Sequence, residues 1–500
     1  MTIPFRALLV NGCLAMFCYS ADINADEPSS GNGIAFTNAN IVTMQTADTV
    51  FGATLLVKDG IIEAIAPAST PIDDSYRIVD LNNQWVVPGF IDGHVHLNQS
   101  GSAYSRPDII DATAIEPFAV EQAWLRKSLP DITHSYVMNG VTTIVDMGGP
   151  SAWIPDYDEL SKNPSSPYIL RAAELISAAP VPALDADGPV FKAVKDAKAA
   201  TDEVKRQLLL SSQVVKFVWT HEAGLSPEAL TERYSQAMKT ARDAGKIVAV
   251  HAESLSYAKA AIKAGAHILV HGVITDYIDD EFIALTKKHN VSYMPTLTAH
   301  QHYKSLFLRN IDFTVRERAI APKRVLQSFN TLQNASAKDV PIYAMMSKYM
   351  TYVDDTASIG TLSVQEQGIV GQLSAMFSER IRDIQFANLK RAADAGLRLA
   401  FGTDAGNPGT LHGVSIHEEM RAWLKAGISP DELLHAMTIG TAEAMKINNI
   451  KGALLSSKEA SFIVFPTSPL SEELPELSPS FVVKSGKIVY SPSSESHDAP

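Results

Sequence analysis

The sequence predicts an α/β protein: a (β/α)8 TIM-like barrel with a small β-sandwich domain formed from both chain ends. Two observations favour this fold. Between residues 89 and 447, short apolar runs alternate with longer helical patterns, as expected of βα units around a parallel sheet. Short alternating or apolar runs flank this region on both sides, and neither set alone has enough strands to bury a face. A chain of 500 residues is long enough for one large and one smaller domain.

Residues 1–25 predict a secretory signal peptide. One basic residue, Arg6, precedes an apolar run that gives way to polar residues, and cleavage is expected between residues 20 and 25. The run is too short for a comfortable membrane span, so we expect a periplasmic or secreted protein. Both cysteines of the chain, Cys13 and Cys18, lie in this segment. Any metal in the mature protein must therefore be held by nitrogen and oxygen.

The β-sandwich domain is expected to combine residues 33–88 with residues 448–490. In the first segment, Lys58-Asp59-Gly60 lies between two apolar runs and signals a hairpin turn. The second segment contains three further strand candidates, which are Phe462–Phe465, Phe481–Val483 and Ile488–Tyr490.

The barrel is expected over residues 89–447. Helical patterns separate its strands, for example Pro227–Ala244 after an N-cap at Ser226. Barrels of this kind gather their functional residues at the carboxyl ends of the strands. The eight candidate strands are Val87–His96, Val141–Asp146, Tyr168–Ile176, Val214–Val218, Ile247–His251, Ile268–His271, Val291–Leu297 and Leu397–Thr403.

A long interval, about residues 300–384, separates the seventh and eighth candidate strands and has a largely helical pattern. Its methionines and tyrosines allow two interpretations. They could line a lid over the active site, or they could fill the core of a packed helical excursion, since Met adapts to irregular gaps. The pattern leaves both open for Tyr343, Met345, Met346, Tyr349, Met350 and Tyr352.

Composition and charge narrow the class of partner. A hydrophobic content of 46% and a charged content of 19% are ordinary for a globular protein with a sizeable core. The net charge of −13 argues against binding to nucleic acids and to anionic membrane surfaces. The expected partner is a small-molecule substrate, and the sequence is compatible with a homo-oligomer.

Six residues with metal-ligand chemistry lie at five of the candidate strands. His94 and His96 are two residues apart, so on a strand their side chains point the same way. A single His or Asp at a strand end is usually structural, and a lysine in a central strand is rare because burying an ammonium group is costly. Together the six predict a metal site of nitrogen and oxygen ligands. They are His94, His96, Lys216, His251, His271 and Asp404.

Two strings carry a resemblance to a known family. Val86–Asn98 is Val-Val-Pro-Gly-Phe-Ile-Asp-Gly-His-Val-His-Leu-Asn, and Gly402–Ala405 is Gly-Thr-Asp-Ala. Both resemble the amidohydrolase superfamily, in its branch of imidazolonepropionase-like and prolidase-like enzymes. The resemblance covers about residues 33–490 apart from the 300–384 excursion. It implies two divalent metal ions, with zinc as the expected metal. One would be held by His94, His96 and Asp404, the other by His251 and His271, with Lys216 carboxylated by CO2 to a bridging carbamate.

The resemblance also implies an activity. The protein would hydrolyse a carbon–nitrogen (amide or peptide) bond in a small substrate such as a dipeptide or an N-acyl amino acid. A hydroxide held between the metals would attack the carbonyl, and Asp404 would pass a proton to the leaving nitrogen.

Three alternatives stay open at this point. A single-metal enzyme that opens a cyclic amide, as an imidazolonepropionase does, would use His94, His96, His251 and Asp404, but it leaves Lys216 unexplained. Lactone or phosphotriester hydrolysis needs the same metal site. A non-enzymatic solute-binding protein would not need an intact set of ligands.

Substrate-binding residues are harder to predict. Arg106 follows the first barrel strand in a loop, where its guanidinium could bind a terminal carboxylate bidentately. His412 and Glu253 could contact substrate or orient the ligands. His300 and His302 have the spacing of a metal pair, but they follow the seventh strand in a polar stretch and are expected to be solvated.

Overall fold

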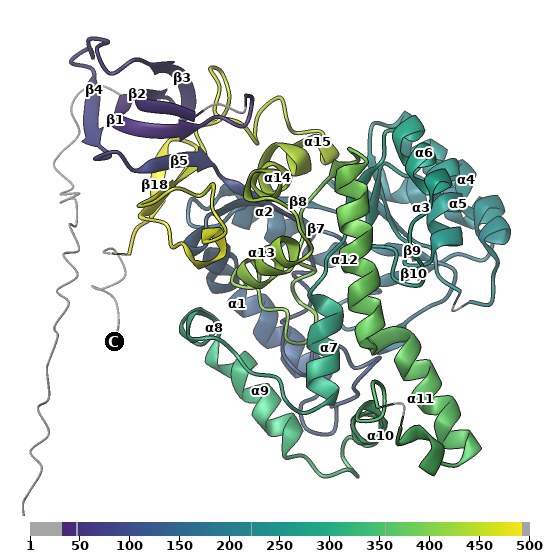
Figure 1. Ribbon diagram of the computed structural model, residues 1–500. Helices are drawn as coiled ribbons and strands as arrows, with labels where there is room; N and C mark the ends of the chain where they lie inside the picture. Colours follow the sequence, from purple (N-terminus) through teal and green to yellow (C-terminus); the bar gives the residue numbers. More distant parts are fainter. Residues whose placement is uncertain (1–32, 47–48, 222, 356, 493–500) are drawn as a thin grey trace, which may run out of the picture.

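The computed structural model describes residues 33–46, 49–221, 223–355 and 357–492. The predicted signal peptide at 1–25 lies outside these ranges and stays a prediction. Figure 1 shows a small β-rich part made from the two chain ends (purple and yellow), an α/β body beside it, and a group of helices at the far side. No helix within the described residues is long and apolar enough to cross a membrane.

The β-rich part is a sheet of eight strands from both ends of the described chain. The strands are β1 (Gly33–Val42), β2 (Thr49–Lys58), β3 (Ile61–Ala66), β4 (Tyr76–Asp80), β5 (Trp85–Pro88), β16 (Phe462–Phe465), β17 (Phe481–Lys484) and β18 (Lys487–Tyr490). Their order is β18-β17-β16-β5-β1-β2-β3, with β4 paired to β1. The two ends join where β5 and β16 pair antiparallel, Val86 opposite Val464.

Hydrogen bonds join all the strands that were expected to form the β-sandwich. The strands form a single hydrogen-bonded sheet rather than two separate sheets. Phe36 of β1 packs edge-to-face on Phe462 of β16, with ring centroids 5.1 Å apart, and stacks on Phe481. The sheet therefore bends over its own apolar core, which gives the same burial that two facing sheets would give.

The α/β body contains two parallel sheets. One consists of β6 (Phe90–Val95), β7 (Val141–Asp146) and β8 (Tyr168–Arg171). The other has the order β10-β9-β11-β12-β13-β14-β15. Its strands are β9 (Leu175–Ser177), β10 (Phe191–Ala193), β11 (Val214–Val218), β12 (Ile247–His251), β13 (Ile268–Val270), β14 (Ser292–Met294) and β15 (Arg398–Leu399).

Backbone hydrogen bonds link the two sheets at both of their edges. On one side Gln213 N donates to Arg171 O. On the other, Gly93 N donates to Phe401 O and Asp404 N donates to His94 O. The end of β6 is therefore tied to the segment that follows β15.

Two predicted barrel strands are each split in the structure. Val87–His96 divides at Pro88-Gly89, so that β5 belongs to the terminal sheet and only β6 belongs to the body. Tyr168–Ile176 divides into β8 and the start of β9. Just after β8, Ala172 N donates a hydrogen bond to Asp146 O, whereas in β9 Leu175 N donates to Val190 O. One continuous apolar run can thus contribute strands to two different sheets.

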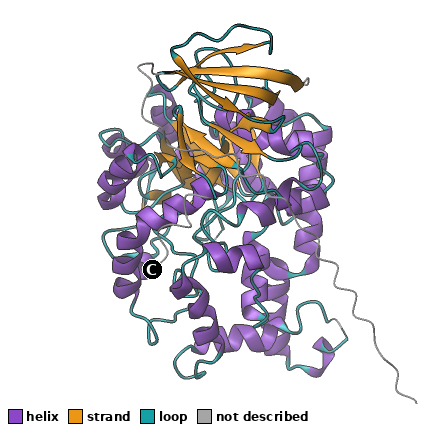
Figure 2. Cartoon of the chain, turned by 90° about the vertical axis from the view of Figure 1, so that its left-hand side faces the viewer, coloured by secondary structure: helices purple, strands orange, loops and turns teal. Residues whose placement is uncertain are grey.

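Helices surround these strands, as the view in Figure 2 shows. They are α1 (Phe118–Met138), α2 (Ile154–Lys162), α3 (Ala197–Gln207), α4 (Pro227–Asp243), α5 (Leu255–Ala264), α6 (Asp280–His289), α13 (Ile416–Lys425), α14 (Pro430–His435) and α15 (Thr441–Ala444). The predicted cap of α4 is present, because the Ser226 side chain accepts a hydrogen bond from Ala229 N.

The interval between β14 and β15 forms a group of helices, most of them in the lower part of Figure 1, which we call the helical excursion. It consists of α7 (Ala299–Phe307), α8 (Val315–Ile320), α9 (Lys323–Gln333), α10 (Pro341–Met350), α11 (Val364–Phe377) and α12 (Glu379–Asp394). Tyr343, Tyr349 and Met350 are buried in its apolar core beside Phe307 and Phe377. This burial favours the packed excursion over the lid.

Candidate metal centre

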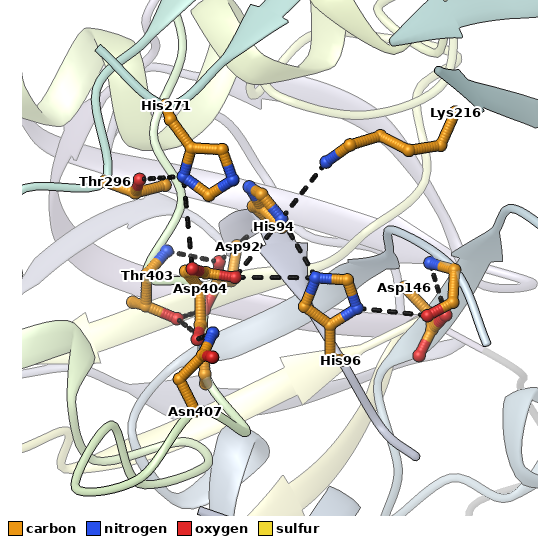
Figure 3. Close-up of polar contacts among 12 residues, drawn as sticks. Asp92, His94, His96, Asp146, Lys216, His271, Thr296, Thr403, Asp404 and Asn407 are labelled. Atoms are coloured by element: carbon orange, nitrogen blue, oxygen red, sulfur yellow. Dashed lines mark hydrogen bonds and ion pairs between the residues drawn. The ribbon is translucent and has the colours of Figure 1, made fainter. Parts of the chain in front are cut away.

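His94 and His96 point to the same place from the end of β6. Their Nε2 atoms lie 3.3 Å apart. Asp404 Oδ1 lies 3.3 Å from His94 Nε2 and 3.5 Å from His96 Nε2. Figure 3 shows the two imidazoles and the carboxylate converging. A backbone hydrogen bond from Asp404 N to His94 O, 2.8 Å long, holds the two segments that carry these side chains together.

The other three predicted ligands lie around this group. Lys216 extends from the middle of β11 and places Nζ 3.5 Å from His94 Nε2 (Figure 3). The ring of His271, just after β13, lies 4.7 Å from the ring of His94 and 4.5 Å from that of His251. The structure thus brings all six predicted side chains together.

Burial sets the protonation of these groups. It lowers the pKa of His96 to about 3 and that of His251 to about 4, and it holds the pKa of His94 and that of His271 well below the ordinary value. Burial also lowers the pKa of Lys216, which is 1% exposed. Neutral imidazoles keep a lone pair on one ring nitrogen, which is the form that binds a metal ion.

Two atoms of this group have no hydrogen-bond partner among the described residues: Asp404 Oδ1 and His94 Nδ1. A buried carboxylate oxygen that faces two imidazole nitrogens without a hydrogen bond is costly. Burial accordingly raises the pKa of Asp404. A divalent cation would satisfy Asp404 Oδ1 and the Nε2 lone pairs of His94 and His96 that face it, so the residues fit a metal ion.

The backbone at the centre is strained. His271, Thr296 and Asp404 have positive φ angles of 74°, 46° and 60°. This left-handed region is unfavourable for side chains other than glycine, most of all for a β-branched residue such as Thr296. Thr296 Oγ1 lies 2.8 Å from His271 Nδ1, which orients that ring. Strained backbone therefore aims ligand side chains at this centre.

Two buried carboxylates that the sequence analysis did not single out support the ligand strands. Asp92 accepts hydrogen bonds from Thr403 N and Thr403 Oγ1, at 3.0 and 2.7 Å. Asp146 accepts from Leu97 N at 2.7 Å. Burial raises the pKa of Asp92 to about 7 and that of Asp146 to about 6. Both follow apolar strand residues and could have been found by the rule that identified Asp404.

A glycine allows the strands to approach so closely. A Cβ on Gly402 would lie 2.6 Å from Met294 Sδ and 2.8 Å from His94 Cβ. A larger residue would push β6 away from the segment that carries Asp404.

A second group of possible ligands adjoins the first. His251, Glu253 and His271 place one ligand atom each within 4.8 Å of one another. Glu253 Oε1 also lies 3.0 Å from Nε2 of His300, in the first turn of α7. Glu253, which was predicted as a substrate or orienting residue, therefore lies between the ligands and the helical excursion.

The prediction that His300 and His302 are solvated is wrong. The side chain of His300 is 18% exposed and that of His302 is 10% exposed. His302 contacts Thr410 Oγ1 at 2.9 Å and Glu418 Oε2 at 2.6 Å. Each histidine has a carboxylate partner far away in the sequence, and a local pattern of polar residues cannot reveal it.

Arg106 lies close to the centre, but its guanidinium is already engaged. Nε and Nη2 donate to the two carboxylate oxygens of Asp108, at 2.8 and 2.6 Å, and Nη1 donates to Asn407 Oδ1 at 3.0 Å. Asn407 Nδ2 in turn donates to the backbone oxygen of Asp404 at 3.1 Å. Arg106 thus supports the loop that carries Asp404.

His412 is packed against the loop that follows β6. Its Nδ1 lies 2.7 Å from the hydroxyl of Tyr136, and its Nε2 lies 2.7 Å from Gln99 O. Both ring nitrogens are used, and burial lowers the pKa of His412 to about 4. This geometry is that of a neutral imidazole that holds the loop in place.

Comparisons with known proteins identify the family and the fold. The sequence model of the amidohydrolase family matches residues 85–489. An imidazolonepropionase from Chromobacterium violaceum is 24% identical over 441 residues, 86% of this chain and 90% of that protein. Among solved structures, a putative prolidase from Bifidobacterium longum superposes with a TM-score of 0.65 at 21% identity, covering 92% of this chain and 95% of that one. A Xaa-Pro dipeptidase with methionine bound in its active site gives 0.64 at 19% identity, covering 92% and 100%.

Proposed function

We infer the function from the premise that this chain belongs to the amidohydrolase family and is a hydrolase that acts on carbon–nitrogen bonds. We propose that it cleaves an amide or peptide bond in a small substrate such as a dipeptide or an N-acyl amino acid, with two divalent metal ions at the strand ends. The observation that carries this proposal is the convergence of His94, His96, Lys216, His251, His271 and Asp404, with an unpartnered carboxylate oxygen among them.

The scaffold of this site is, in our proposal, a closed (β/α)8 barrel. The hydrogen bonds from β6 to Phe401–Ala405 on one side and from Gln213 to Arg171 on the other support a continuous ring of parallel strands. All proposed ligands then lie at the carboxyl ends of strands or within one, at the face where barrels of this kind perform chemistry.

The proposed ligands divide into two sets. His94, His96 and Asp404 would hold one ion, and His251 with His271 the other. Zinc suits both sets because their donors are nitrogen and oxygen. When bound, such ions lower the pKa of water and polarise the carbonyl group that is attacked.

Lys216 would bridge the two sets after carboxylation by CO2. An ammonium group beside two dications would be repelled, whereas a carbamate supplies two anionic oxygens. Burial lowers the pKa of Lys216 and so favours the neutral amine, which is the form that reacts with CO2. The position of Nζ, 3.5 Å from His94 Nε2, suits such a bridge.

Asp404 is the proposed proton carrier. Its Oδ1 has no hydrogen-bond partner among the described residues, and burial raises the pKa of the carboxyl group toward the range where it can both accept and give a proton. It would accept a proton from the attacking water and deliver it to the leaving nitrogen.

A single-metal hydrolase of cyclic amides is the second candidate. The similarity to the imidazolonepropionase over 441 residues favours it. Lys216 separates the two candidates, because a single ion held by His94, His96, His251 and Asp404 gives a buried lysine no role.

A substrate screen of the zinc-loaded protein tests the proposal. We expect the highest kcat/KM for dipeptides or N-acyl amino acids, with lower values for cyclic amides, lactones and phosphotriesters. Turnover confined to lactones or phosphotriesters would overturn it. Preference for a cyclic amide together with one ion per chain would establish the second candidate instead.

A further inference from the structure

Glu419 is a fully buried carboxylate on α13 whose hydrogen bonds reach the segment between β14 and α7. Its Oε1 accepts from Leu297 N at 2.8 Å, and its Oε2 accepts from Thr298 N at 3.0 Å and from Thr298 Oγ1 at 2.9 Å. Trp423 Nε1, one turn further along α13, donates to Oε1 at 3.0 Å. Both carboxylate oxygens are therefore engaged, and three of these four bonds hold one short stretch of chain.

That stretch depends on Glu419 for its backbone hydrogen bonds. β14 ends at Met294 and α7 begins at Ala299, so the N–H groups of Leu297 and Thr298 belong to neither element. Both residues are buried, and a buried N–H group without an acceptor is costly. The carboxylate of Glu419 supplies the acceptors, and it thereby fixes the path of the backbone.

The residue just before this stretch is strained and contacts a proposed metal ligand. Thr296 is β-branched and has a φ of 46°, a conformation that persists only where the surroundings impose it. Its Oγ1 lies 2.8 Å from His271 Nδ1. The bonds from Leu297 and Thr298 to Glu419 begin one residue later, so they hold Thr296 in the conformation that reaches His271.

The other buried carboxylates of the centre act in a comparable way. Asp92 accepts from Thr403 N, just before a proposed ligand, and Asp146 accepts from Leu97 N, just after one. Both support the set formed by the ends of β6 and β15. Glu419 is the corresponding carboxylate for the other set, and it acts one residue further away.

We propose that Glu419 is a positioning residue for the second metal ion. By holding the backbone after Thr296, it keeps Thr296 Oγ1 on Nδ1 of His271 and leaves the other ring nitrogen of His271 for the ion. Hydrogen-bond partners of this kind orient metal-binding histidines and raise the affinity for the metal. The inference rests on the proposed function for the presence of two ions.

Zinc titration of the metal-free full chain by calorimetry tests the inference without turnover. Glu419→Gln keeps the shape of the side chain but places an NH2 donor where a backbone N–H group needs an acceptor. We expect the affinity for one of the two ions to fall roughly tenfold or more. The other ion should bind as in the wild type, because the supports of His94, His96 and Asp404 are unchanged.

A double-mutant cycle shows whether Glu419 acts through Thr296. Thr296→Ala removes the hydroxyl group that contacts His271, and it should lower the affinity for the same ion by a similar factor. The double variant Glu419→Gln/Thr296→Ala should bind that ion no more weakly than Thr296→Ala alone, because the two residues act in series. Multiplied losses in the double variant would show that Glu419 does not act through Thr296.

Two further variants control for stability and folding. Glu317→Gln changes another buried glutamate, which accepts from Thr314 N at 2.6 Å inside the helical excursion, and it should keep both zinc affinities. Thr298→Val removes only the bond from Thr298 Oγ1 to Glu419. It should weaken the same ion by roughly threefold, as the loss of one hydrogen bond predicts, and it decides the question if Glu419→Gln does not fold.

Crystal structures of the metal-free wild type and of Glu419→Gln provide a readout that does not depend on the number of ions. The separation of Thr296 Oγ1 and His271 Nδ1 should increase from 2.8 Å to beyond about 3.5 Å in the variant. An unchanged separation, or wild-type affinity for both ions in Glu419→Gln, would overturn the inference. A wild-type protein that binds two ions but hydrolyses no carbon–nitrogen substrate would remove the proposed function and leave the role of Glu419 standing.

Discussion

The metal centre and the helical excursion use their polar side chains differently. At the metal centre, Asp404 and His94 each bury an atom without a partner among the described residues, and three backbone positions have positive φ. In the excursion, α8 and α11 begin with capping boxes at Thr314 and Ser363, and Lys304 is paired with Asp354. In the excursion these polar side chains cap helices and form ion pairs, whereas at the strand ends a strained backbone aims side chains at one point.

The two regions meet on one helix. His300 of α7 binds Glu253 at the metal centre, and the hydroxyl of Tyr303, on the same helix, donates to Asn407 at 2.9 Å. Asn407 in turn holds the backbone of Asp404. We therefore expect changes inside the excursion to alter stability, and changes at its contact with the centre to alter activity.

Asp404→Asn should give the largest effect on activity. The substitution keeps the shape of the side chain but removes its charge and its ability to carry a proton. We expect kcat to fall by about a thousandfold or more. The melting temperature of the metal-free variant should equal or exceed that of the metal-free wild type, because an unpartnered buried carboxylate is removed. A loss of less than about tenfold in kcat would exclude Asp404 as the proton carrier.

Phe307→Ala should destabilise the helical excursion without removing metal ions from the metal centre. Phe307 is fully buried against Tyr303, Tyr343 and Phe377. Removing a buried aromatic ring costs about 3–5 kcal/mol of unfolding free energy. Denaturant unfolding would measure that cost, and metal analysis should find the same number of ions as in the wild type. Loss of metal together with stability would mean that the two regions are one cooperative unit.

The smallest effect concerns His302 and depends on pH. Burial alone would lower the pKa of His302, but the charge of Glu418 raises it above 6.5, and the charge of His302 holds the pKa of Glu418 below 4.5. A raised histidine pKa stabilises the folded state fully below the unfolded value and less as pH rises through the folded value. His302→Gln should therefore cost about 1–2 kcal/mol near pH 5.5 and less at pH 8.5.

Unfolding at the two pH values measures this difference directly. A cost that grows as pH rises would contradict the ion pair between His302 and Glu418.

What could be predicted from the sequence follows the same division. The strands Val214–Val218 and Ile247–His251 have the bounds predicted for them, because each is a short run rich in β-branched residues. Metal-ligand residue types at the ends of such strands, together with a lysine inside one, located the six candidate ligands. These local patterns missed the roles of His300 and Thr296, which depend on Glu253 and His271 at a distance along the chain. They also did not foresee that Pro88-Gly89 divides one apolar run between two sheets.

Metal analysis of the Lys216→Ala variant tests whether Lys216 bridges a two-metal centre. We expect close to two divalent ions per wild-type chain, fewer in Lys216→Ala, and partial recovery of the ions and of turnover when short-chain carboxylic acids replace the bridging oxygens. One ion per wild-type chain, or an unchanged count with full activity in Lys216→Ala, would contradict it and favour the single-metal hydrolase.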